Sequence, residues 1–437
     1  MKTPKAILAL LVLLPALLPA TGGRSLAFHE GGAGECEGCH TMHNSEGGFA
    51  VASNGRPAGM GNRYLLKGGD SSSTCLNCHE KAGDVGPTSY HVSTPGSEMP
   101  FGVPPKQLGP GGDFGWLRKS YTWIPAFGST LSNSEGDRHG HNVVAGDYGY
   151  LQDALKMTAP GGSYPAASLS CVACHDPHGR YRRDQDGSIA VTGKPIRGSG
   201  SYATGAEPDA AMAVGAYRLL GGNGYYPKSL GPAFSFINGP PAAVAPADYN
   251  RSESTTATRV AYGQGMSEWC RNCHPNIHRD GSGGGLVHPA GTEAPLGGVM
   301  VDYYNRYIKT GDLSGVEATS WLSLVPFEAG TNNYALLRNI VTATPTKGPS
   351  TADGTPRVMC LTCHRAHASG WDGATRWNTK TPYVTYSGKY SQEGEAYQPY
   401  GQGRSEMEAL RAYYDRPASL FSPEQAALCT KCHTSVP

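Results

Sequence analysis

The sequence predicts an irregular fold that is mostly coil, with a few short α-helices and minimal β-structure. Glycine and proline, with 60 and 33 residues, make up about a fifth of the 437 residues. Only 38% of the residues are apolar, which is a small supply for an ordinary hydrophobic core. A chain of this composition needs another source of buried apolar surface in order to fold.

One short pattern, Cys-x-x-Cys-His, occurs six times and contains every cysteine of the chain. In chain order, motifs 1 to 6 are Cys36-Cys39-His40, Cys75-Cys78-His79, Cys171-Cys174-His175, Cys270-Cys273-His274, Cys360-Cys363-His364 and Cys429-Cys432-His433. Two thiols one helical turn apart can add to the two vinyl groups of a haem, and the next histidine can bind the iron on its proximal face. The pattern therefore predicts six covalently attached haem c groups, around which the polypeptide wraps.

Two other uses of paired cysteines have to be weighed. An even number of cysteines in an exported chain often indicates disulfides, and Cys-x-x-Cys pairs can also hold zinc. Neither use requires a histidine directly after every pair, and histidine accounts for only 15 of the 437 residues. We therefore favour haem attachment at all six motifs.

The N-terminus has the features of a secretory signal peptide. Two lysines precede an apolar run over 6–18, and a small-residue cleavage site ends at Ala27. We expect a signal peptide over 1–27 and a single mature domain over 28–437. The apolar run is interrupted by a proline and is shorter than a membrane-spanning helix, so we expect a secreted protein without a membrane span. The formal net charge of +1 does not favour nucleic acid as a partner.

Few regular elements are expected along the chain. Capping boxes predict helices over 405–415 and 422–433, and a third candidate helix covers 208–220. Strands are weak, with a short stretch at 383–386 at best. The six motifs follow no fixed period, which favours one continuous domain over a stack of equal repeats.

Nine histidines remain after the six proximal ones, enough to bind the second axial position of every iron. They are His29, His43, His91, His139, His141, His178, His278, His288 and His367. A haem with imidazole on both faces has no open position for a substrate. It can transfer electrons but cannot reduce a small molecule at its iron.

Four of these histidines lie only three or four residues after a proximal histidine. They are His43, His178, His278 and His367. Such a neighbour is too close in sequence to reach the far face of the same haem, so each should bind a different haem and hold two macrocycles close together. Methionine is the alternative sixth ligand, but Met266 and Met359, which closely precede motifs, are more typical of packing residues.

The remaining histidines lie in loops. His91, His141 and His288 are the best placed to act as distal ligands, and His29, near the mature N-terminus, is a further candidate. His139 lies only two residues before His141, so one of the two imidazoles is superfluous. We expect His139 to be a solvated side chain.

Longer stretches around the motifs carry a family resemblance. They are 28–29, 36–44, 111–116, 174–179, 261–269 and 363–370. Together they closely resemble the outer-surface hexahaem nanowire cytochromes of metal-reducing bacteria, over essentially the whole mature chain. The resemblance implies a secreted helical filament of head-to-tail subunits, with closely stacked bis-histidine haems. It also implies that His43 binds the fifth haem, held by His364, of the neighbouring subunit.

The favoured function is therefore extracellular electron transfer by a polymerising cytochrome. Its redox partners would be periplasmic and outer-membrane cytochromes, Fe(III) or Mn(IV) minerals, electrodes or partner cells. One alternative is a multihaem reductase of a small substrate, which needs a haem with an open face. Another is a monomeric periplasmic electron carrier, which keeps the bis-histidine haems but forms no filament.

Overall fold

The computed structural model describes most of the chain after the expected signal peptide. The described residues are 36–52, 58–81, 83–125, 130–254, 259–277, 288–307, 315–316, 320–321, 324–342, 348–349, 355–391 and 401–433. The expected signal peptide over 1–27, His29 and His278 lie outside these residues. Among the described residues, no helix has the length and apolar character that crossing a membrane requires.

The helices are short and widely spaced. The α-helices are α1 (Cys36–Cys39), α2 (Ser71–His79), α3 (Cys171–Cys174), α4 (Met266–Cys270), α5 (Gly298–Arg306), α6 (Tyr334–Thr342), α7 (Cys360–Cys363) and α9 (Glu406–Ala412). Single 3-10 turns are η1 (Arg63–Leu65), η2 (Gly96–Glu98), η3 (Phe114–Arg118), η4 (Gly136–Arg138), η5 (Gly146–Tyr148), η6 (Ala166–Ser168), η7 (Tyr217–Leu219), η8 (Pro232–Phe234), η11 (Asp372–Ala374), η12 (Ala418–Leu420) and η13 (Leu428–Lys431). Coil connects these elements, as the glycine and proline content predicts.

The strands form small antiparallel pairs. They are β1 (Ser45–Glu46) with β2 (Phe49–Ala50), β3 (Tyr121–Trp123) with β4 (Ser132–Ser134), β8 (Ala243–Val244) with β9 (Ala261–Tyr262), and β5 (Arg182–Arg183) between β6 (Ile189–Ala190) and β7 (Val214–Gly215). Sheets of two or three residues per strand contribute little stability by themselves. The predicted fold class, mostly coil with few short helices and minimal β-structure, is confirmed.

One of the three predicted helices forms as expected. In α9 the Ser405 hydroxyl accepts a hydrogen bond from the Glu408 N–H, and the Glu408 carboxylate accepts one from the Ser405 N–H. This reciprocal capping box is the signal that predicted the helix.

The other two predicted helices are wrong. Residues 422–433 contain only the turn η13, because the Val384 N–H donates to the Gln425 carbonyl at 2.7 Å and the segment pairs with 383–386 instead. Residues 208–220 become β7 and η7, because β5 pairs with β7. In both places a partner segment far away in sequence offers the backbone hydrogen bonds that the helix would have made.

The hydrophobic core is divided rather than continuous. Four separate clusters of buried apolar side chains occur among the described residues. The largest is rich in aromatic residues and includes Trp116, Trp321 and Trp371. Met266 and Met359 are buried in the second cluster, which confirms them as packing residues.

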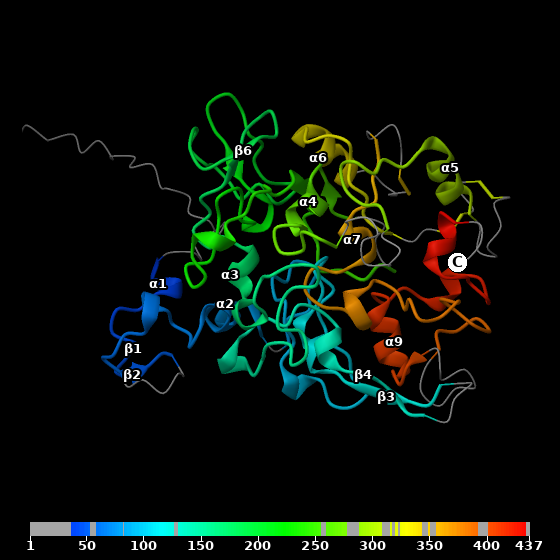
Figure 1. Cartoon of the computed structure of the whole chain (residues 1–437), viewed down its shortest axis with the longest axis horizontal. Helices are drawn as coiled ribbons and strands as arrows, with labels where there is room; N and C mark the ends of the chain where they lie inside the picture. The colour runs from blue at the N-terminus through cyan, green and yellow to red at the C-terminus, as the bar shows by residue number, and fades with distance from the viewer. Residues whose placement is uncertain are drawn as a thin grey trace, which may run out of the picture.

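The helices that carry attachment motifs run along the long axis of the molecule, from α1 at one end, past α2 and α3, to α4 and α7 in the other half (Figure 1). The N-terminal α1, β1 and β2 lie at one end, and α5 and the C-terminal segment lie at the other. The helices α2 and α3 lie side by side toward the first end, and α4 lies beside α7 in the other half. Because all of these helices except α5 carry attachment motifs, the motifs are distributed from end to end.

Candidate haem-binding sites

Each Cys-x-x-Cys-His motif closes one helical turn. In five motifs the backbone N–H of the histidine donates to the carbonyl of the first cysteine at 2.9–3.1 Å, and motif 2 forms the last turn of α2. A single turn brings the two thiols to the same side of the backbone. None of the twelve cysteines, all of which are described, forms a disulfide. The chain therefore presents six dithiol turns of the kind that haem attachment requires.

Motifs 2 and 3 meet through their thiols, and motifs 4 and 5 do the same. Cys75 and Cys171 share a hydrogen bond that, together with burial, raises the pKa of the Cys75 thiol. Cys270 and Cys360 share an equivalent bond, with the same effect on the pKa of Cys270. At these two junctions the attachment points of successive motifs are in contact.

The two junctions are built in the same way. The Ser72 hydroxyl accepts a hydrogen bond from the Cys171 N–H at 3.1 Å, and the Ser267 hydroxyl accepts one from the Cys360 N–H at 3.1 Å. Both serines are buried, and each lies three residues before the first cysteine of motif 2 or motif 4. This serine spacing is a signal that our sequence reasoning missed.

The remaining successive motifs are also neighbours. Burial raises the pKa of Cys39 in motif 1, with a contribution from Cys78 in motif 2. Burial and the nearby Cys273 raise the pKa of Cys174. This effect shows that motifs 3 and 4 are neighbours. Burial and Cys429 raise the pKa of Cys363 to about 11. Motifs 5 and 6 are therefore neighbours as well. The six motifs therefore lie one after another in the order in which they occur along the chain.

Most proximal histidines are oriented by a hydrogen bond from Nδ1, the ring nitrogen that would not bind the iron. Five of them donate from Nδ1 to a backbone carbonyl at 2.7–2.9 Å, in the pairs His40 with Tyr64, His79 with Tyr90, His175 with Arg218, His274 with Pro160 and His364 with Gly373. This bond places the proton on Nδ1 and leaves the Nε2 lone pair available. Metal-ligating histidines typically have this arrangement.

Three distal candidates stand opposite a proximal histidine at a suitable spacing. The ring centroids are 6.4 Å apart for His40 and His178, 6.2 Å for His274 and His141, and 6.2 Å for His433 and His288. With metal–nitrogen bonds of about 2 Å, two imidazoles on opposite faces of one iron place their centroids roughly 6 Å apart. Each pair therefore fits one iron between its rings.

Two further candidates lie near the remaining motifs. Burial and the neighbouring His175 lower the pKa of His367 to about 3. Burial lowers the pKa of His79, with a smaller contribution from His91. His91 is 3% exposed, and its Nε2 has no hydrogen-bond partner among the described residues. A buried imidazole nitrogen without a partner is costly, so a metal ligand role suits it.

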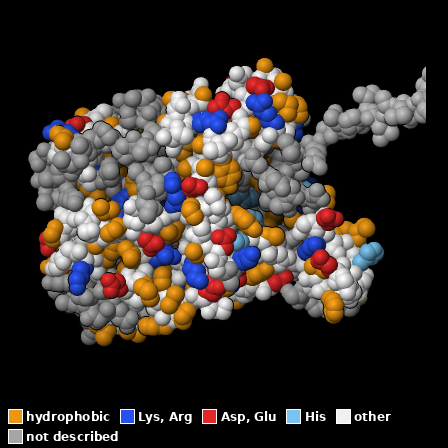
Figure 2. All heavy atoms as spheres, turned by 180° about the vertical axis from the view of Figure 1, so that it is seen from behind, with side chains coloured by type: hydrophobic (Ala, Val, Ile, Leu, Met, Phe, Trp, Pro, Cys, Tyr) orange, Lys and Arg blue, Asp and Glu red, His pale blue; other side chains and the backbone are white. Residues whose placement is uncertain are grey.

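His141 and His175 are shielded from solvent without being packed tightly. Burial lowers the pKa of His141 and of His175, although both rings keep exposed surface. Figure 2 shows histidine side chains at the bottom of a hollow on one face. A lowered pKa favours the neutral imidazole, which is the form that binds metals.

His43 and His139 differ sharply in their surroundings. His43 lies on an exposed loop after α1, beside Met42, which is 73% exposed. His139 is fully buried, and both of its ring nitrogens are hydrogen-bonded within the protein. The expectation that His139 is solvated is therefore wrong. Its side chain is packed and hydrogen-bonded in the protein interior.

A pocket beside motif 5 carries an excess of positive charge that sequence reasoning missed. Arg365, Arg376 and Arg416 line it together with a single acid, Glu253. The Nε of Arg365 is buried without a hydrogen-bond partner among the described residues. Arginines bind carboxylates well, so this pocket suits the propionate groups at a haem edge.

Known proteins resemble the chain over nearly its whole length. No protein-family model matches it. The C-type cytochrome OmcS of Geobacter sulfurreducens is 52% identical over 421 residues, which are 96% of this chain and 96% of OmcS. The chain belongs to the OmcS family of c-type cytochromes.

Solved structures of OmcS match the fold as well. They are the outer membrane cytochrome S filament from Geobacter sulfurreducens and a cryo-electron microscopy structure of the OmcS nanowires from the same organism. Each has a TM-score of 0.85 and 52% identity, and covers 94% of this chain and 100% of its own. Membership of the OmcS family confirms the c-type haem cofactor expected from the motifs.

Proposed function

We propose that this chain transfers electrons outside the cell through a filament of head-to-tail subunits. The observation that carries this proposal is the row of six neighbouring attachment motifs, which extends from one end of the molecule to the other (Figure 1). A row that reaches both ends can continue into the next subunit. A head-to-tail contact that does not close produces an open fibre, and OmcS itself forms filaments.

We further propose one axial pair for each haem. The pairs within the chain are His40 with His178, His79 with His91, His175 with His367, His274 with His141, and His433 with His288. His364 pairs with His43 of the neighbouring subunit. This assignment uses twelve histidines for six irons and leaves the earlier candidates His29 and His278 without an iron.

The proposed ligand pairs favour electron transfer as the chemistry of the haems. When bound by two imidazoles, haem iron exchanges one electron and offers no open position to a substrate. Hydrogen bonds from Nδ1 to backbone carbonyls orient five proximal imidazoles and the distal candidates His141 and His367, so these ligands need little rearrangement when the charge on the iron changes. This arrangement supports electron transfer over the reductase alternative.

His43 distinguishes the filament from a monomeric carrier. It is exposed in the loop between α1 and β1. These two elements lie at one end of the molecule (Figure 1), where a side chain can reach a second subunit. A metal bond across the interface would make assembly and completion of the fifth haem a single event. A monomeric carrier has no use for an exposed ligand at this place.

The test replaces His43 by alanine, with Met42→Ala as the matched control because Met42 is the exposed neighbour without an imidazole. Electron microscopy counts filaments, and carbon monoxide titration of the reduced protein counts irons with an open position. We expect His43→Ala to abolish filaments and to bind one carbon monoxide per chain, while Met42→Ala forms filaments and binds none. Filaments of normal length in His43→Ala would overturn the proposal.

The remaining assignments follow from this function. We propose that residues 1–27 are a secretory signal peptide and that residues 28–437 form one hexahaem domain. Electrons would enter from periplasmic and outer-membrane cytochromes and leave to Fe(III) or Mn(IV) minerals, electrodes or partner cells. N-terminal sequencing of the secreted protein, expected to begin at Phe28, tests the processing site.

A further inference from the structure

Three chain segments meet where two of the proposed distal ligands lie. We call residues 111–112, 139–141 and 366–369 the brace. The His141 N–H donates to the His367 carbonyl at 2.8 Å, and the Ser369 N–H donates to the His139 carbonyl at 2.9 Å. Segments 139–141 and 366–369 therefore form a short antiparallel pair, with Gly140 opposite Ala368.

Glycines allow the three segments to approach closely. A Cβ at Gly140 would lie 2.2 Å from the His367 carbonyl oxygen, and one at Gly111 would lie 2.9 Å from the His367 Nδ1. The His367 N–H donates to the Gly111 carbonyl at 2.7 Å, and its Nδ1 donates to the Gly112 carbonyl at 3.2 Å. The His141 Nδ1 donates to the Ala366 carbonyl at 2.7 Å. Both imidazoles are thus oriented by the brace itself.

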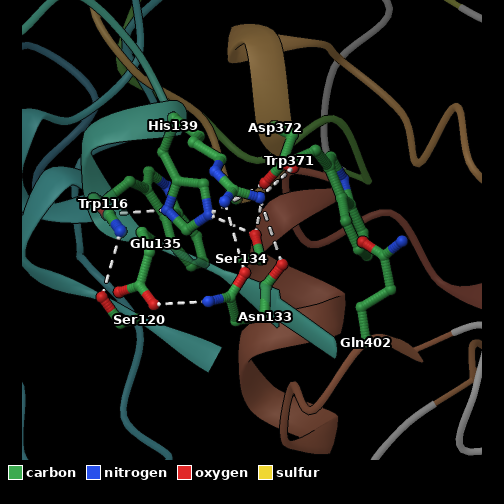
Figure 3. A network of polar contacts seen from close by, with 12 residues as sticks. Trp116, Ser120, Asn133, Ser134, Glu135, His139, Trp371, Asp372 and Gln402 are labelled. Carbon is green, nitrogen blue, oxygen red and sulfur yellow. Dashed lines mark hydrogen bonds and ion pairs between the residues drawn. The ribbon is translucent and has the colours of Figure 1, made fainter. Parts of the chain in front are cut away.

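His139 connects the brace to the surrounding core (Figure 3). Its Nδ1 donates to the Trp116 carbonyl at 2.9 Å, and its Nε2 lies 2.8 Å from the Ser134 hydroxyl. Trp116 belongs to η3, which begins two residues after Gly112, and the His139 carbonyl accepts from Ser369. One residue therefore contacts or adjoins all three segments of the brace.

Arg404 and Asp372 make this connection rigid. The fully buried Arg404 donates from Nε to the Gly370 carbonyl at 2.6 Å, and its guanidinium lies 3.3 Å from the Ser134 hydroxyl. The Ser134 hydroxyl donates to Asp372. A fully connected buried network has one preferred geometry.

We propose that His139 is a positioning residue that sets the relative placement of His141 and His367, and through them the placement of the haems bound at motifs 3 and 4. The inference rests on the ligand pairs proposed above, in which His367 serves motif 3 and His141 serves motif 4. Since the two ligands belong to successive haems, a shift of the brace would change the geometry between those haems and leave the other four unaffected.

The test uses His139→Phe, which keeps an aromatic ring and removes both hydrogen bonds, and His139→Asn, which can still donate near the Nδ1 position. Electron paramagnetic resonance of the ferric protein reports the angle between the two axial imidazole planes of each haem. We expect His139→Phe to shift two of the six signals and the reduction midpoints of the same two haems. His139→Asn should restore them in part.

The control is Arg183→Met, which breaks a different buried network. Arg183 is fully buried and donates to the carbonyls of Gly200 at 2.9 Å and Ala243 at 3.4 Å, outside the brace. It should lower stability without moving the signals of motifs 3 and 4. If His139→Phe lowers stability and leaves all six signals in place, the proposal is overturned. If it does not fold, Ser134→Ala is measured in the same way and by the same criterion.

Two reference variants separate this proposal from the ligand pairs on which it rests. His141→Met and His367→Met should each move one signal, because methionine ligation raises the potential of the haem, and so assign the signals to motifs 4 and 3. Failure of both to move a signal would refute the ligand pairs. Movement in both, combined with unmoved signals in His139→Phe and Ser134→Ala, would refute only the positioning role.

Discussion

Replacing Gly112 by alanine should detach His367 from the position in which we propose that it binds iron. Gly112 has φ +90°, a conformation that costs an alanine about 1–2 kcal/mol. A Cβ there would lie 1.8 Å from the Ala368 carbonyl oxygen, whereas real contacts of this kind begin at 3.0 Å. The brace must therefore open by about 1 Å or more, because packed interiors do not absorb such a shift elsewhere.

The size of the effect follows from these two contributions. Overpacking of a buried site costs about 1–3 kcal/mol, so the total loss of stability should be about 3 kcal/mol. Metal–nitrogen bonds tolerate only about 0.2 Å, so the imidazole cannot follow the backbone and remain bound. We expect the reduced Gly112→Ala protein to bind one carbon monoxide per chain, while the unaltered protein binds none.

Two other glycines separate the possible causes. Gly149 has φ +73° and nothing within 4 Å of its Cβ position, so Gly149→Ala isolates the conformational cost of about 1 kcal/mol. Gly109 has its nearest neighbours at 4.0 Å, so Gly109→Ala should change neither stability nor carbon monoxide binding. Chemical denaturation measures the stability of all three. The reasoning is refuted if Gly112→Ala is no less stable than Gly149→Ala and binds no carbon monoxide.

Three further predictions follow from other sites. His91→Ala should open one iron to carbon monoxide yet leave filaments intact, because His91 serves its own subunit; loss of filaments in electron micrographs would contradict this. Ser267→Ala should destabilise the protein by about 1 kcal/mol in denaturant titrations, because it removes the hydrogen bond to Cys360; an unchanged midpoint would show that the bond is dispensable. Burial raises the pKa of Glu328 to about 7, so the folded state keeps a proton that the unfolded chain loses near pH 4.5. Stability should then fall as the pH rises from about 5 to 7, and thermal melts of Glu328→Gln should lack this decline.

The attachment motifs were predictable because their chemistry is local. Two thiols and an imidazole must lie within one helical turn, so the spacing in the sequence is the geometry of the site. The capping box at Ser405 and Glu408 succeeded for the same reason, since all of its partners lie within one turn. By contrast, residues 422–433 have a good capping pattern but pair with 383–386, and this alternative cannot be seen in a local window.

The distal ligands show the limit of sequence reasoning most clearly. His139 and His141 are two residues apart and chemically identical, yet one is enclosed by Trp116, Ser134 and Arg404 while the other faces His274. Apart from Ser134, which is five residues from His139, the hydrogen-bond contacts that set these roles come from segments 23 to more than 200 residues away along the chain. No periodicity in the sequence records such contacts.

The sequence by itself determined the kind of cofactor, the number of attachment sites and the loop-rich character of the fold, because covalent attachment and backbone propensity act over a few residues. Only the tertiary structure decided which histidines face one another, which motifs are neighbours and which imidazole serves as an anchor. These outcomes depend on long-range backbone hydrogen bonds and on close approaches at glycines such as Gly112 and Gly140. Such contacts form only when segments distant in the chain pack together, because their free energy comes from burial and pairing rather than from local conformation.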